Sequence, residues 1–301
     1  MKRFIIRTSK FVLYLSLIIS VFYAVFFLRN SEKYHLDKSN IIIGDSNTRW
    51  GINDSILSNY QNYSTGGETY LFAYTKLKML DRDNRIDTLL LSFNPHNLIN
   101  NQWYDDSKMT SLQNRMPYFF SNFTIEDHSM LLKKMPKNYF FSLIKIGKPN
   151  LEKLLYLNRE DKMFKFGSFS PVKSRNTNDT IFSKNQIAEV NETELLYLKK
   201  IKQECKLKNI KLIFIQTPKN KLTRRYVNYD FKEFYKVYQQ ELGDIDFLDF
   251  SKMNIRQDYF WDIYHLNDRG ADYFTTFLKE RKIKNLLNSK FNQNKNPRLS
   301  H

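Results

Sequence analysis

The sequence predicts an α/β fold in which a parallel β-sheet carries helices on both faces. Short apolar or β-branched runs end at turn residues, and amphipathic segments with helical spacing lie between them. Runs of the first kind are typical of buried parallel strands. The alternation of strands with helical segments is typical of a sheet covered on both sides.

The expected elements follow one another along the chain. Strands are predicted at residues 40–43, 87–93, 210–216 and 245–249, and helices at 67–82, 192–208, 229–242 and 268–286. Residues 97–190 break this alternation and are interpreted as an insertion of helix and loop. The polar tail, residues 288–301, is predicted to be disordered.

The N-terminal segment predicts a membrane anchor. Residues 11–28 contain no charged side chain, and the ten residues before them carry only basic charges. A helix of roughly 20 apolar residues crosses a bilayer, and about 17 suffice. Basic flanks stay in the cytoplasm. We therefore expect a cytoplasmic flank (1–10), a single-pass signal anchor (11–28), a linker (29–39) and an external domain (40–287). A cleaved signal peptide and a buried core helix are the alternatives.

Composition restricts the partners. The formal net charge is +17, but the basic residues are spread along the chain and the expected topology places them outside the cell. This argues against nucleic acid and favours an anionic envelope polymer or lipid surface, with a solvated basic surface as the alternative. The Asn-, Lys- and Ile-rich composition suggests a bacterium. The single cysteine, Cys205, excludes an internal disulfide. The five histidines lack metal-ligand spacing, so neither metal nor cofactor is predicted.

A serine follows the first predicted strand. Residues 41–48 read Ile-Ile-Ile-Gly-Asp-Ser-Asn-Thr, which places Ser46 after a glycine turn at the carboxyl edge of the sheet. Ligands of open α/β sheets bind at that edge. The backbone amide of Ser46 can point into the same space. The alternative is that Asp45 and Ser46 only cap a helix.

A carboxylate and an imidazole lie three residues apart before the last predicted helix. A nucleophilic serine needs a base within hydrogen-bond reach, and the base needs an orienting carboxylate. Asp262 and His265 supply both from one loop. The alternative is that Asn267 or Asp268 caps the helix and His265 is an ordinary loop residue.

Two further blocks lie between these signals: residues 62–69 (NYSTGGET) and residues 92–95 (SFNP). In order and spacing, the four blocks resemble those of the SGNH (GDSL-type) hydrolases. The resemblance covers residues 40–98 and about 210–286. It implies a flavodoxin-like, three-layer α/β/α fold with the insertion outside the match.

The resemblance implies a role for each matched residue. Ser46 would be the nucleophile, His265 the general base and Asp262 its orienter. The backbone amides of Ser46 and Gly67 and the side chain of Asn94 would form the oxyanion hole.

Some positions depart from the pattern or leave alternatives open. The third block has Ser92 and Pro95 where the family has glycine and aspartate, so Asn94 is alternatively a turn residue. Gly66 beside Gly67 leaves the amide donor ambiguous by one residue. Arg49 and Trp50 are candidates for binding an anionic or sugar group, or for surface packing. His96 is not expected to be catalytic.

The anchor and the four blocks together resemble the membrane-anchored branch of this family, which includes alginate O-acetylation proteins and the D-alanyl transfer protein. The resemblance implies an acyl-ester hydrolase or O-acyltransferase acting on a cell-surface glycan outside the bacterial cytoplasmic membrane. A multi-pass membrane acyltransferase is an expected partner. The alternative is a non-catalytic module of the same fold that binds a glycan or a partner.

Overall fold

The computed structural model describes residues 1–29, 35–82, 84–99, 115–116, 119–143, 145, 167–173, 189–221, 231–281 and 283. The chain divides into two compact units. One comprises Met1–Tyr34 and Thr110–Glu160, and the other His35–Met109 and Asp161–His301. The predicted tail, residues 288–301, lies outside the described residues. The predicted domain boundaries stay a prediction.

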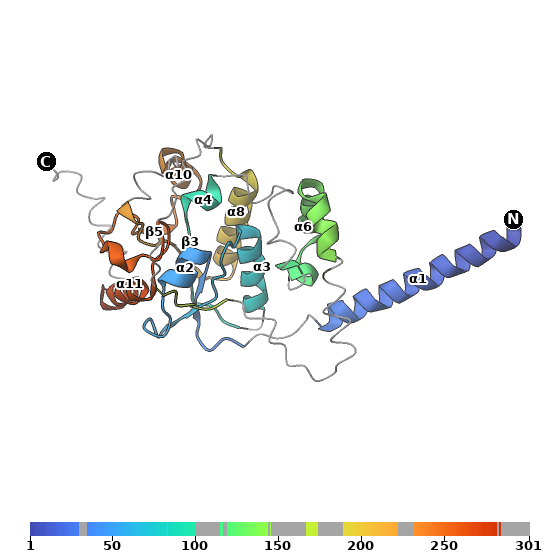
Figure 1. Cartoon of the computed structure of the whole chain (residues 1–301), viewed down its shortest axis with the longest axis horizontal. Coiled ribbons are helices and arrows are strands. Elements are labelled where there is room, and N and C mark those ends of the chain that lie inside the picture. Colours follow the sequence, from blue (N-terminus) through green and yellow to red (C-terminus); the bar gives the residue numbers. More distant parts are fainter. Residues whose placement is uncertain are drawn as a thin grey trace. The chain divides into compact units, whose positions relative to one another are not determined.

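The second unit is built on a five-stranded parallel sheet with strand order β2-β1-β3-β4-β5. Figure 1 labels β3 and β5 of this sheet among the helices of the unit. The strands are β1 (Asn40–Ile43), β2 (Tyr60–Asn62), β3 (Thr88–Ser92), β4 (Lys211–Gln216) and β5 (Asp246–Asp249). All four pairings are parallel, with Ile41 opposite Leu89 and Leu90 opposite Ile213. The chain reverses its direction of progress across the sheet between β1 and β3, which makes the carboxyl ends of these strands the expected ligand edge.

The four predicted strands are confirmed, and the structure contains a fifth strand, β2, that was not predicted. The helices of this unit are α2 (Ser46–Gly51), α3 (Tyr70–Asp81), α4 (Pro95–Leu98), α8 (Glu192–Leu207), α10 (Phe231–Val237) and α11 (Asp268–Arg281). A π-helical turn, Tyr238–Leu242, follows α10, and a 3-10 turn covers Gln257–Tyr259. The long predicted helices correspond to α3, α8, α10 and α11. The predicted helix 229–242 begins outside the described residues.

Helices cover both faces of the sheet because successive strand residues point to opposite sides. On one face, Ile213 and Leu248 belong to a buried cluster with Phe274 and Leu278 of α11. On the other, Phe214 of β4 stacks on Phe93, with ring centroids 4.4 Å apart. Phe93 also contacts Phe234 of α10, and α3 packs against α8. The predicted three-layer arrangement is therefore confirmed for this unit.

The first unit contains α1 (Lys2–Arg29), η2 (Phe120–Asn122) and α6 (Ile125–Lys134). A capping box starts α6: Thr124 Oγ1 accepts a hydrogen bond from the Asp127 amide, and an Asp127 carboxylate oxygen accepts one from the Thr124 amide. Of these elements, η2 and α6 lie within residues 97–190, and the predicted insertion of helix and loop stays a prediction.

The predicted anchor, residues 11–28, lies within α1, and part of it falls outside the residues whose side chains are described. Among the described residues, no helix combines the length and the hydropathy required of a membrane span.

Gly44 is required by the close approach of the ends of β1 and β3. A Cβ built at this position would lie 2.2 Å from Ser92 Cβ and 2.6 Å from Thr48 Oγ1. No real side chain tolerates such contacts without backbone movement. The glycine therefore lets two strand ends and the first turn of α2 meet at the edge of the sheet.

We predict that Gly44→Ala lowers the free energy of unfolding by at least about 1–3 kcal/mol, because the methyl group overpacks a buried contact. Urea unfolding measures the change. Adding Ser92→Gly removes the nearest clash and should restore part of the loss. Gly66→Ala, whose methyl group would meet nothing closer than 3.9 Å, is the control. A Gly44→Ala variant as stable as the control would contradict this account.

Candidate active site

Ser46 stands where the fold places ligands, directly after β1. It is the first residue of α2, and Asp45 caps this helix by accepting a hydrogen bond at Oδ1 from the Asn47 amide, at 2.9 Å. Ser46 is partly buried, whereas its neighbours Asp45 and Asn47 are buried. The hydroxyl is thus held on a short, well-anchored turn at the carboxyl edge of the sheet.

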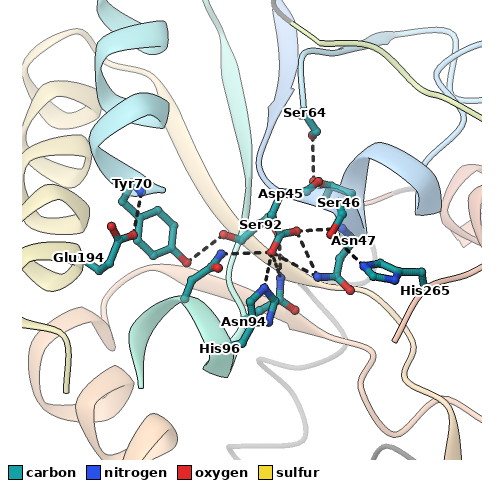
Figure 2. A network of polar contacts seen from close by, with 12 residues as sticks. Asp45, Ser46, Asn47, Ser64, Tyr70, Ser92, Asn94, His96, Glu194 and His265 are labelled. Atoms are coloured by element: carbon teal, nitrogen blue, oxygen red, sulfur yellow. Dashed lines mark hydrogen bonds and ion pairs between the residues drawn. The ribbon is translucent and has the colours of Figure 1, made fainter. Parts of the chain in front are cut away.

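The structure brings the three predicted catalytic side chains together in one chain of contacts. Ser46 Oγ lies 2.8 Å from His265 Nε2, although the residues are 219 positions apart (Figure 2). On the other side of the imidazole, Nδ1 lies 2.8 Å from Oδ2 and 3.0 Å from Oδ1 of Asp262. A neutral imidazole that donates from Nδ1 to Asp262 has its Nε2 lone pair directed at the serine hydroxyl.

The Asp262 carboxylate is fixed by the loop that carries His265. Asp262 Oδ1 accepts hydrogen bonds from the backbone amides of Tyr264, at 2.6 Å, and His265, at 2.7 Å. Partial burial raises the pKa of Asp262, but the hydrogen bond and charge of His265 and these two amides outweigh it, so the net pKa is below the ordinary 3.8. The group is therefore an acceptor at neutral pH.

Asn267 secures the same loop to the last helix. Its Oδ1 accepts from the Gly270 amide at 2.9 Å, and its Nδ2 donates to the Asp258 carbonyl at 2.7 Å. This confirms that Asn267 caps the start of α11. The capping and catalytic interpretations of the loop are compatible because Asn267 holds the loop in which Asp262 and His265 lie.

Trp50 packs against the imidazole. Its ring centroid is 4.4 Å from that of His265, at an interplanar angle of 70°, and 5.4 Å from that of Trp261. Edge-to-face pairs of this kind restrict the orientation of a ring. The helix that carries Ser46 thus also packs against the imidazole that contacts the serine.

A buried carboxylate, Asp45, lies beneath the serine and collects donors from two strand ends (Figure 2). Ser92 Oγ donates to Oδ1 at 3.0 Å. His96 Nε2 lies 2.8 Å from Oδ2. The side-chain amides of Asn47, Asn94 and Asn97 also donate to this carboxylate, at 3.1–3.3 Å. Asp45 is 1% exposed, so these contacts replace its hydration.

The surroundings keep Asp45 ionised. Burial alone would raise its pKa, but the hydrogen bond and charge of His96, the charge of Lys219 and the Asn47 amide hold the pKa well below the ordinary value. Lys219, which follows β4, donates to Asn47 Oδ1 and is itself buried. Burial lowers the pKa of Lys219 to about 8, against the opposing charges of Asp45, Asp262 and Asp249.

Asn94 does not direct its amide at Ser46 in this arrangement. It is fully buried, and its Nδ2 donates to Ser92 Oγ at 2.7 Å and to Asp45 Oδ2 at 3.3 Å. The two amide hydrogens are therefore both engaged. The predicted oxyanion role of Asn94 stays a prediction, and it requires the amide to turn.

Of the two adjacent glycines, Gly66 lies beside the serine. A Cβ built on Gly66 would lie 3.9 Å from Ser46 Cβ. Gly67 has a positive φ of 65°, the left-handed conformation that glycine adopts freely. The predicted amide donation by Gly67, or by Gly66, and by Ser46 stays a prediction.

The second block holds α2 in place. Asn62, at the end of β2, donates from Nδ2 to the carbonyl oxygens of Thr48, at 3.0 Å, and Ile52, at 2.8 Å. Thr48 Oγ1 also donates to Ser64 Oγ at 2.8 Å. These contacts satisfy carbonyls at the C-terminal end of α2 and keep Ser46 at a fixed height above the sheet.

Sequence reasoning missed the groups that surround Asp45. The non-catalytic assignment of His96 stays a prediction, and its contact with Asp45 was not predicted. The position of Lys219 in the sequence could have indicated a site residue, because it follows β4 at the carboxyl edge of the sheet, where functional side chains gather. Among the described residues, no group of three or more His, Cys, Asp or Glu side chains is arranged to hold a metal ion.

The comparisons with known proteins add little to this geometry. A protein-family profile matches residues 167–288, which include Asp262 and His265 but make up less than half of the chain. The search of curated proteins gives no match. Among solved structures, a presumed acylhydrolase of Bacteroides fragilis matches with 12% identity, a TM-score of 0.36, and 87% of this chain and 95% of that chain covered. Similarity this low carries no inference about activity.

The arrangement itself is suited to nucleophilic chemistry. A hydroxyl, an imidazole and a carboxylate are connected by contacts of 2.8 Å, which is the distance range for proton transfer between positioned groups.

We predict that Asp45 contributes to stability above its unfolded-state pKa and that this contribution is lost in acid. Below about pH 4 the unfolded chain binds a proton that native Asp45 resists, so the free energy of unfolding falls as the pH falls. Asp45→Asn should lower stability at pH 7 and flatten the decline between about pH 5 and 2. Urea titrations at each pH measure this.

The matched control is Asp246→Asn, which removes an exposed carboxylate from β5. This variant controls for the loss of one exposed carboxylate. Parallel curves for the wild type and Asp45→Asn would show instead that Asp45 makes no pH-dependent contribution.

Proposed function

We propose that this protein is a membrane-anchored, extracytoplasmic acyl-ester hydrolase or O-acyltransferase that acts on a cell-surface glycan through an acyl-Ser46 intermediate. The observation that carries the proposal is the contact chain from Ser46 Oγ through His265 to Asp262. The four blocks that resemble SGNH hydrolases support it.

In the proposed chemistry, Ser46, His265 and Asp262 each have a separate role. His265 Nε2 takes the proton of Ser46 as Oγ attacks the carbonyl carbon of the ester. When the tetrahedral intermediate collapses, the same nitrogen returns the proton to the leaving sugar oxygen, and the acyl group stays on Ser46. Asp262 stabilises the charged imidazole between the two events. Water as the second acceptor gives hydrolysis, and a sugar hydroxyl gives transfer.

The developing oxyanion needs preorganised donors, each worth about 3–4 kcal/mol. The resemblance assigns this task to the backbone amides of Ser46 and Gly67 and to the Asn94 side chain. Because the Asn94 amide donates to Asp45 and Ser92, we propose that the backbone amides provide most of the stabilisation.

We further propose that residues 11–28 anchor the chain in the bacterial cytoplasmic membrane, with residues 1–10 inside. The uncharged run and its basic flank support this. The linker, residues 29–39, spans at most roughly 35 Å. It would hold Ser46 near the outer surface, where a lipid-linked or emerging glycan and a multi-pass acyltransferase partner are accessible.

We predict that a fluorophosphonate probe labels Ser46, because an activated serine attacks the phosphorus as it would attack an ester carbonyl. Ser46→Ala should abolish labelling, and His265→Ala should reduce its rate by about 100-fold or more. Ser58→Ala, which removes an exposed serine, is the control. In-gel fluorescence with mass mapping of the labelled peptide provides the measurement.

The same labelling assay distinguishes the proposed catalytic function from a non-catalytic binding function. A folded full-length protein that does not react at Ser46 would support the non-catalytic binding module. The replacement of the third-block glycine by Ser92, whose hydroxyl donates to Asp45, is the observation that favours that alternative.

An experiment in the native host distinguishes hydrolysis of the acyl ester from transfer of the acyl group. Loss of activity in Ser46→Ala should raise the acyl content of the surface glycan if the protein is a hydrolase and lower it if it is a transferase. Alkaline release and quantification of acetate measures the content. An unchanged content would contradict both forms of the proposal for acetyl esters.

We predict that the full-length protein stays with the membrane after alkaline carbonate extraction. Replacing Leu15 and Ile18 together with arginine should move it to the soluble fraction, because each charge costs about 3 kcal/mol in a spanning helix. Leu207→Arg, at an exposed position of α8, is the control. Release of the wild type would contradict the anchor, and a mass lacking the N-terminal segment would indicate cleavage.

A further inference from the structure

The Arg49 guanidinium lies beside the nucleophile. Arg49 is three residues after Ser46 in α2, so the two side chains lie on neighbouring positions of one helical face. A Cβ built on Gly66 would be 3.9 Å from Arg49 Nη1 and 3.9 Å from Ser46 Cβ. The guanidinium and the serine therefore border the same space, which Gly66 leaves open because it has no side chain.

This guanidinium has no acceptor within the described part of the chain. Arg49 Nε is buried and has no hydrogen-bond partner, and no described carboxylate forms an ion pair with Arg49. By contrast, the exposed Arg85 and Arg256 each pair with a neighbouring aspartate at 2.9 Å. A buried donor without a partner is destabilising, so its retention beside Ser46 indicates a ligand that satisfies it.

The chemistry of the missing acceptor follows from the donor. A guanidinium presents parallel N–H groups that match the two oxygens of a carboxylate or a phosphate. A neutral sugar hydroxyl offers a single acceptor and no charge. The neighbouring Trp50 ring packs against His265 and leaves Arg49 as the cationic group on α2 next to Ser46.

We propose that Arg49 binds a carboxylate or phosphate group on the sugar that carries the scissile ester, so that the substrate is an acidic glycan. This inference rests on the proposed function, because it places the substrate ester at Ser46. The carboxylate of a uronic acid and the phosphate of a sugar phosphate share the required chemistry. Arg49 is then a specificity-determining residue that positions the ester carbonyl over Ser46 Oγ.

The test is protection of Ser46 from a fluorophosphonate probe in the full-length protein. The protecting ligands are methyl glucuronide, methyl glucoside 6-phosphate and neutral methyl glucoside, each titrated against the labelling rate. At least one anionic sugar should protect at about tenfold lower concentration than the neutral one. The anionic sugar that protects at the lower concentration identifies whether Arg49 binds a carboxylate or a phosphate.

Substitution then assigns the preference to Arg49. In Arg49→Met the ratio between neutral and anionic protection constants should fall to about one, and in Arg49→Lys, which keeps the charge but loses the fork, it should be intermediate. Arg85→Met, at an exposed arginine, should keep the wild-type ratio and controls for the general basic charge. Thermal melting verifies that each variant is folded.

The outcomes separate this inference from the proposed function. If Ser46 is not labelled in the wild type, the proposed nucleophile fails. If Ser46 is labelled but the wild type shows equal protection by neutral and anionic sugars, the anionic subsite is overturned and the nucleophile stands. A preference that persists unchanged in Arg49→Met also overturns the role of Arg49.

Discussion

The buried carboxylate of Asp45 is the interaction on which the site depends. It accepts hydrogen bonds from its own turn through Asn47, from the end of β3 through Ser92, and from α4 through Asn97. A buried charge is stable only when such donors replace water. Because these donors come from separate segments, the ionised Asp45 ties them together and fixes the turn that presents Ser46.

These hydrogen bonds to Asp45 explain the arrangement of the third block, residues 92–95. Ser92 approaches β1 so closely that position 44 has no room for a Cβ. In return, its hydroxyl reaches both Asp45 and the Asn94 amide. The Asn94 amide is therefore engaged with Asp45 and Ser92, which is a physical cost for the oxyanion function proposed for Asn94.

His265 and Asp262 are held in place differently, by local geometry. Asp262 receives two backbone amides from the next three residues and the imidazole of His265, so this half of the site forms within one loop. Packing of α2 against α11 and the contact of Trp50 with the imidazole then bring this loop to Ser46. The contacts between Ser46, His265 and Asp262 therefore depend on helix packing over one face of the sheet.

Sequence patterns by themselves predicted four strands and the long helices, because burial period and turn residues are local properties. The choice of Ser46, Asp262 and His265 rested on the resemblance of the four blocks to a known family. The patterns missed β2, whose three residues are too short and polar to show a period. Only the tertiary structure placed Lys219 and His96 near Asp45, left Arg49 without an acceptor and engaged the Asn94 amide with Asp45 and Ser92. Those features arise from contacts between distant segments, and such contacts leave no periodic signal in the chain.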